Sequence, residues 1–139
     1  MPISIYQASV PVFVRGLNTL VALLDKAEAH AQAAGLDAAA LVQAGLADDM
    51  YPLAGQIQRA SDTSKFAVQR LSGVAAPSFA DTETTLDALR TRIADTIRYI
   101  KSVAPEKFDG AEGRTITIKL GALQPSFNGT SYLFTFALP

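Results

Sequence analysis

Apolar residues recur every three or four positions through three long segments, and this spacing constrains the fold more than any other feature of the chain. The first segment runs from about Ile5 to Ala34 and predicts a helix that ends at Gly35. Pro11 lies in its first turns, where it would start or kink the helix. The apolar stripe of this helix consists of Val10, Phe13, Leu17, Leu20, Leu24, Ala27 and Ala31.

The second long segment follows a short helix that is expected to begin after Asp37 and to extend to Leu46. The second long helix is predicted to begin near Asp48, whose carboxylate would accept hydrogen bonds in the first turn, and to end at Gly73. Pro52 is tolerated that early in a helix. The apolar or small residues of its stripe are Leu53, Ile57, Ala60, Ser64, Ala67 and Leu71.

The third long helix is predicted to begin after Asp81 or Thr82, with Glu83 near the positive end of the helix dipole, and to end before Pro105. Its stripe consists of Leu86, Leu89, Ile93, Ile97 and Ile100.

Beyond Pro105 the periodicity changes from that of a helix to that of a strand. Residues 115–120 alternate polar and apolar side chains, Asn128-Gly129 is typical of a turn, and residues 132–136 alternate less clearly. The pattern predicts a loose β-hairpin over one end of the bundle, with a helical turn as the alternative for the last segment. We therefore expect a mainly α-helical single domain over residues 1–139, with helices in 1–105 and a loop and hairpin in 106–139.

Composition excludes several classes of function. The 139 residues suffice for one domain with a core, and the formal net charge is −1. The 12 basic residues form no run, which argues against a nucleic-acid-binding protein. There is no cysteine, so disulfides and thiolate chemistry are excluded. The apolar stretch 10–24 is interrupted by Pro11, Arg15 and Asn18, so no membrane span is expected, and the absence of a signal-peptide pattern favours a cytoplasmic location.

Two polar ridges are the candidate binding site. On the second helix, Asp49 and Gln56 fall at the edge of the core face at 100° per residue. Asp49 would serve there as acceptor or base, and Arg92 of the third helix as an anion clamp. The complete candidate set is Asp49, Gln56, Arg70, Arg92, Thr96 and Tyr99.

A simpler interpretation of the same residues remains open. Asp49 would only complement the helix dipole, Gln56 would lie at a half-hydrated edge, and Arg92 would pair with Asp95 or with a carboxylate of a neighbouring helix. Capping residues and ion pairs are commoner than binding sites, so the polar residue types alone do not choose between the two.

Several short motifs resemble those of a known protein family. They are residues 47–53 (Ala-Asp-Asp-Met-Tyr-Pro-Leu), 56–58, 60–62, 70–73, 81–83, 92–93, 132–133 and 136–139 (Phe-Ala-Leu-Pro), together with Pro77 and Thr96. In this order they resemble a bacterial family of unknown function within the DinB/YfiT-like superfamily of helical bundles. The resemblance covers essentially the whole chain and implies an up-and-down bundle. It also implies a kinship with metal-dependent enzymes that use three histidines on two facing helices.

The chain departs from this family in two respects. Members are expected to continue past the Phe-Ala-Leu-Pro segment into an aromatic, histidine-containing closing helix, which the 139 residues lack. Without it an apolar groove would lie along the long helices, so a homodimer is expected. His30 is the single histidine, it lies in an alanine-rich run typical of a solvent-facing helix surface, and one histidine cannot build the three-histidine site.

These observations predict a small-molecule-binding or assembly domain without a working metal site or cofactor, rather than an enzyme. The alternative is a metal-dependent enzyme of the thiol-transferase kind, whose remaining ligands lie in the missing C-terminal helix.

Overall fold

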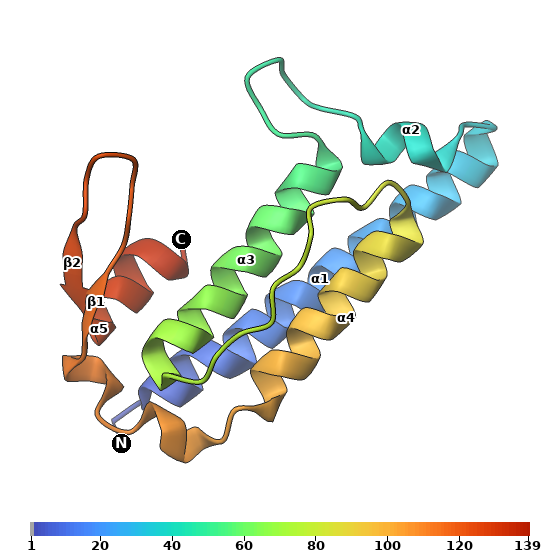
Figure 1. Ribbon diagram of the computed structural model, residues 1–139. Coiled ribbons are helices and arrows are strands. Elements are labelled where there is room, and N and C mark those ends of the chain that lie inside the picture. Colours follow the sequence, from blue (N-terminus) through green and yellow to red (C-terminus); the bar gives the residue numbers. More distant parts are fainter. Residues whose placement is uncertain (1) are drawn as a thin grey trace.

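Three long helices form the body of the molecule in a computed structural model that describes residues 2–139 (Figure 1). They are α1 (Ile5–Ala34), α3 (Leu53–Ser72) and α4 (Leu86–Ser102). The bounds predicted for α1 are confirmed. Ser4 and Gln7 form a reciprocal capping box, and Gly35 ends the helix with φ +66°. Pro11 lies inside α1 on its exposed side and does not end the helix.

The predicted apolar stripes meet in one core. Phe13, Leu17 and Leu24 of α1 are buried there. Leu71 of α3 and Ile93 of α4 have no exposed surface. Burying side chains of this size contributes about 1.5–3 kcal/mol each, so this core is the main stabilising feature of the bundle.

The predicted starts of α3 and α4 are wrong. α3 begins at Leu53 after Pro52, and residues 43–52 form a loop, because proline disfavours the helical conformation of the residue before it. α4 begins at Leu86, with the Thr85 hydroxyl accepting from the Ala88 N–H at 3.0 Å. Residues 81–83 stay outside the helix, where Asp81 and Glu83 bond to Arg92.

The short helix α2 (Ala38–Val42) is capped by Asp37 as predicted, yet it ends before Leu46. The chain then turns back towards α3, and the Ala44 carbonyl accepts from the Leu53 N–H at 2.9 Å.

The connection between α3 and α4 sets the direction in which α4 runs. α3 and α4 run in the same direction, antiparallel to α1, and residues 73–85 return along their outer side (Figure 1). α3 is about 30 Å long at 1.5 Å per residue, and 13 extended residues span at most about 43 Å. The connection is therefore just long enough for this crossover, and α4 departs from a simple up-and-down order. We call residues 73–85 the crossover segment.

The C-terminal segment is partly the predicted hairpin. After the turns η1 (Pro105–Phe108) and η2 (Ala111–Gly113), strand β1 (Thr115–Thr117) pairs antiparallel with β2 (Ser126–Asn128). Residues 132–136 are not a strand: the chain forms α5 (Gly129–Tyr132) and the π-helical turn η3 (Leu133–Ala137), as the helical alternative predicted.

Asn128-Gly129 is not the turn of the hairpin. The Asn128 side chain instead accepts from the Ser131 N–H at 2.8 Å and caps α5.

Candidate functional site

Arg92 is the centre of the most extensive polar network in the described residues. Its side chain projects from α4 beneath the crossover segment and is 2% exposed. Nη1 donates to Asp81 at 2.8 Å and to Glu83 at 3.0 Å, and Nη2 donates to Asp62 of α3 at 2.9 Å. One buried guanidinium therefore joins α4, α3 and the crossover segment.

A ring of hydrogen bonds completes this network inside the helix pair. Arg92 Nε donates to the Ser61 hydroxyl at 3.1 Å, Ser61 and Thr96 hydroxyls lie 2.8 Å apart, and Thr96 donates to the Arg92 carbonyl at 2.8 Å. Each guanidinium nitrogen thus donates to an atom of the protein. Arg92 pairs with a carboxylate of the neighbouring helix, as the simpler interpretation predicted, whereas Asp95 bonds to Arg98.

A second buried cation lies beside Arg92. The Lys65 side chain is 1% exposed, and its Nζ lies 3.5 Å from an Asp62 oxygen. The same Nζ is 4.5 Å from the ring centre of Phe79 and 4.7 Å from that of Phe66. Phe79, from the crossover segment, also lies 5.6 Å from the Arg92 guanidinium carbon. This aromatic ring covers both cations and fastens the crossover segment over them.

Burial and pairing act in opposite directions on the two acidic groups of the crossover segment. Desolvation alone would raise the pKa of Glu83, but the Arg92 hydrogen bond, together with the Gln58 amide, holds that pKa below its usual value. The pKa of Asp81 is lowered in the same way by Arg92 and Arg59. Arg92 has a raised pKa and stays charged. The network therefore favours the ionised forms of Asp81 and Glu83.

This network predicts acid lability. A carboxyl whose pKa is lower in the folded than in the unfolded chain stabilises the fold above its unfolded value. That stabilisation is lost as pH falls through the folded value. The melting temperature should therefore decrease once the pH is lowered below about 4.5, which is the pKa of Glu83 in the unfolded chain. A Glu83→Gln variant should show a shallower fall between about pH 5 and 3. Equal slopes in calorimetric scans of the two proteins would contradict this assignment.

The six candidate residues lie in different surroundings. Asp49 is exposed in the loop before α3, so its predicted place on that helix is wrong. The exposed Gln56 side chain donates to the Tyr51 carbonyl at 3.2 Å. Arg70 donates to the Tyr132 hydroxyl at 3.1 Å, near the C-terminal segment. The structure joins Arg92 and Thr96 in one network and places the other residues elsewhere. Their role in binding stays a prediction.

Tyr99 of α4 contacts the beginning of the crossover segment. Its hydroxyl donates to the Val74 carbonyl at 2.6 Å, and burial raises its pKa to about 12. It therefore stays neutral and holds the backbone of the crossover segment.

Sequence reasoning did not identify the two partners of Arg92 in the crossover segment, nor which residue of the neighbouring helix is the third. The sequence pattern places Asp81 and Glu83 at the start of the third long helix, where such residues usually cap the helix or complement its dipole. One signal was present: Arg92 lies three residues after the core residue Leu89, a spacing that places both on one face of a helix, and a buried arginine needs acidic or polar partners.

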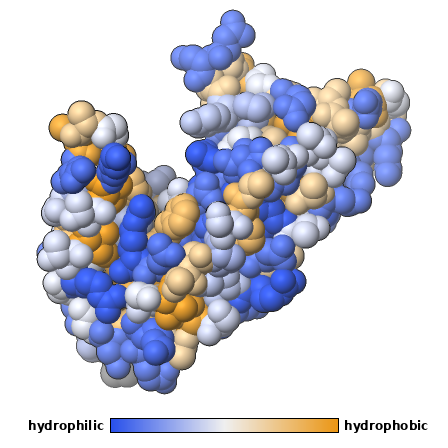
Figure 2. Space-filling model, viewed as in Figure 1, coloured by the Kyte–Doolittle hydropathy of each residue, from blue (hydrophilic) through white to orange (hydrophobic). Residues whose placement is uncertain are grey.

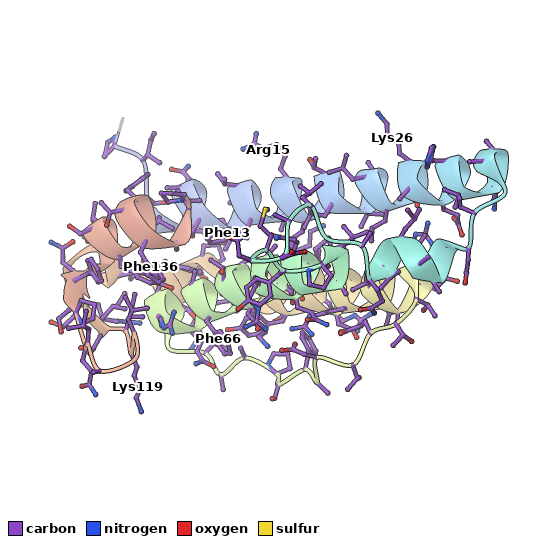
Figure 3. All side chains as sticks on the ribbon, turned by 90° about the horizontal axis from the view of Figure 1, so that it is seen from above. Phe13, Arg15, Lys26, Phe66, Lys119 and Phe136 are labelled. Atoms are coloured by element: carbon purple, nitrogen blue, oxygen red, sulfur yellow. The ribbon has the colours of Figure 1, made fainter. Side chains whose placement is uncertain are left out.

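An open groove lies between α1 and α3, beside the chain end. Its volume is about 590 Å³, and its apolar lining includes Phe13 and Leu20 of α1 with Phe136 of η3. Gln56 and Thr63 form part of the α3 wall. The surface is hollowed between the C-terminal segment and α3 (Figure 2), and Phe13 and Phe136 lie on the same side of α1, away from Arg15 and Lys26 (Figure 3). We call this the α1–α3 groove.

A second hollow, of about 1020 Å³, lies at the N-terminal end of α1. It is bounded by the first turns of α1, by residues 105–112 and by Phe134 and Leu138. We call it the basal groove.

The described residues do not fit the metal site of the wider superfamily. His30 is exposed on α1, as predicted, and within residues 2–139 no three histidine or carboxylate side chains lie together as a ligand group. No metal-dependent step follows from these residues. That further ligands lie in a closing helix stays a prediction.

Helix α1 is also long and apolar enough to cross a membrane. Core helices of soluble proteins pass the same test, and α1 packs against α3 and α4, so this is weak evidence for a membrane span.

The three-helix body and its crossover define a helical bundle of the DinB-like class. Over 96% of this chain and 76% of the other, it is similar to the crystal structure of a DinB family member protein from Shewanella denitrificans, with 35% identity and a TM-score of 0.86. The family described as Domain of unknown function (DUF1993) matches residues 5–139, and the chain belongs to that family. No curated protein matches the chain.

Proposed function

We propose that this chain is an assembly domain that forms a homodimer through the α1–α3 groove. The observation that carries the proposal is the apolar surface that α1 leaves uncovered. Val12, Gly16, Leu20 and Leu23 recur at helical spacing, and none of them is fully buried. At 100° per residue these four residues lie within an arc of about 80°. Apolar stripes of this kind are usually buried against a partner.

Residues near the chain end extend the same apolar surface. Phe136 is 36% exposed and lines the groove, so the apolar lining continues from α1 onto η3. Leu23 is 54% exposed and extends the stripe along α1. A two-fold interface presents the same patch from both subunits, so each stripe would cover the groove of the other.

The Arg92 network supports a structural role rather than a binding role. Its guanidinium nitrogens already donate within the chain, and an incoming anion would have to displace Asp62, Asp81 or Glu83. The α1–α3 groove needs no such displacement. Assembly through apolar surface is therefore better supported than anion binding at Arg92.

Light scattering tests the proposal with two matched substitutions. The wild-type chain of 14.7 kDa should scatter as a dimer at about 50 µM. Leu23→Glu places a charge in the interface and should give a monomer with unchanged helicity. Leu46→Glu changes an equally apolar residue that is 91% exposed and lies off the stripe, and it should leave the dimer intact. A monomeric wild type, or a dimeric Leu23→Glu variant, would contradict the proposal.

A further inference from the structure

We propose that the basal groove is a separate binding site for a hydrophobic organic cation of the aryl-alkylamine class. This inference goes beyond the proposed assembly and rests on a groove that shares only Val12 and Leu138 with the α1–α3 groove. The groove combines an apolar lining with carboxylates along one side. Its volume of about 1020 Å³ lies at the upper end of the range usual for small-molecule sites.

The apolar part of the basal groove would receive the aromatic ring. Ile3 is 76% exposed and Phe134 52% exposed at its mouth, and Phe108 is buried beneath them. The Phe108 ring meets Tyr6 edge to face at 5.5 Å, which fixes this wall. An aromatic ligand would cover exposed apolar surface here without moving the core.

The charge of the basal groove selects a cation. Glu106, Asp109 and Glu112 line it, and no lysine or arginine does. None of the three carboxylates makes a side-chain hydrogen bond or ion pair with the residues that the structure describes. By contrast, Asp62, Asp81 and Glu83 are all paired with Arg92.

The dipole of α1 is too small to neutralise these three carboxylates. Its N-terminus carries the equivalent of roughly +0.5 charge, and the α-amino group of the chain adds at most about one more, against three negative charges on the rim. The N–H of Gln7 already bonds to Ser4 in the capping box. The net field in the groove is therefore negative, and it attracts an ammonium group at its edge.

Tryptamine is the probe, and its fluorescence is the measurement. The chain contains no tryptophan, so excitation near 295 nm reports the ligand alone. Tryptamine is a primary amine and is protonated at pH 7. We expect saturable binding with a Kd of about 0.1–1 mM. Indole-3-propionate has a similar ring and the opposite charge, so it should bind at least about tenfold more weakly at low salt.

Two matched double variants test the carboxylates. Glu106→Gln/Glu112→Gln removes two exposed charges from the groove and should weaken tryptamine binding about fivefold. Asp48→Asn/Asp49→Asn removes two exposed charges outside the groove and should leave the Kd unchanged. Far-UV circular dichroism should match wild type for both, since all four side chains are exposed. Absence of saturation at about 5 mM, equal affinity for indole-3-propionate, or an unchanged Kd in the first variant would each overturn the proposal.

The assembly proposal and this one fail separately. The Leu23→Glu variant should bind tryptamine with the wild-type Kd, because Leu23 does not line the basal groove. If the wild type is a monomer that still binds tryptamine, only the assembly proposal fails. A dimer that does not bind tryptamine overturns only the cation site.

Discussion

Replacing Arg92 with alanine is expected to lower the free energy of unfolding by about 3 kcal/mol, because it leaves Glu83, whose side chain is 10% exposed, without a cation. Asp62 and Asp81 also lose a partner, but Asp62 keeps Lys65 and Asp81 keeps Arg59. The substitution also removes the contact between the guanidinium and Phe79 and leaves the Ser61 hydroxyl without its donor. The crossover segment would lose its main attachment to α4. Urea denaturation followed by circular dichroism measures the change, provided that the slope m stays constant.

Arg90 provides a matched control on the same helix. It also contacts three carboxylates, those of Asp25, Glu28 and Asp87, at 2.6–3.0 Å. Its side chain is 20% exposed and its partners are 43–88% exposed, so water stabilises them when the arginine is removed. Arg90→Ala should therefore cost about 1 kcal/mol or less. Similar losses for the two variants would show that burial does not set the importance of Arg92.

The location of Arg92 shows what sequence alone could predict of the candidate site. Its spacing of three residues from Leu89 placed it at the edge of the core face, and a carboxylate partner on a neighbouring helix was one predicted outcome. Its strongest contacts come from Asp81 and Glu83, which the crossover brings back along the bundle. Local periodicity does not encode that return path. For the same reason the two acids were predicted to cap α4.

The predicted helix bounds were right where local sequence determines them and wrong where it was not followed. The limits of α1 depend on neighbours in sequence, and the apolar stripe with Gly35 predicted those limits. The structure adds the Ser4–Gln7 capping box as the reason for the start. The start of α3 depends on the conformation that Pro52 imposes on Tyr51, a local signal that was given too little weight. The end of the chain was ambiguous, since Tyr132 and Leu133 are both fully buried and fit neither strand alternation nor one helical stripe cleanly.

Gly129→Ala is expected to destabilise the fold by about 3 kcal/mol, although helix propensity predicts the opposite sign. Gly129 is the first residue of α5, and alanine favours a helix over glycine by about 1 kcal/mol. A Cβ atom there, however, would lie 1.8 Å from the Ala111 carbonyl oxygen and 2.7 Å from its carbon. Both are backbone atoms, so the clash cannot be relieved by rotating a side chain. α5 would have to move away from η2.

Gly16→Ala is the control that measures the effect of helix propensity without a steric clash. Gly16 lies inside α1, and a Cβ atom there would meet nothing within 4 Å, so alanine should stabilise the chain by up to about 1 kcal/mol. The stability of both variants should be measured at low protein concentration, because Gly16 also belongs to the proposed dimer surface. The movement of α5 should in addition loosen the fully buried Tyr132 and weaken its contact with Arg70. If Gly129→Ala is as stable as Gly16→Ala, the close packing of α5 against η2 does not exist in solution.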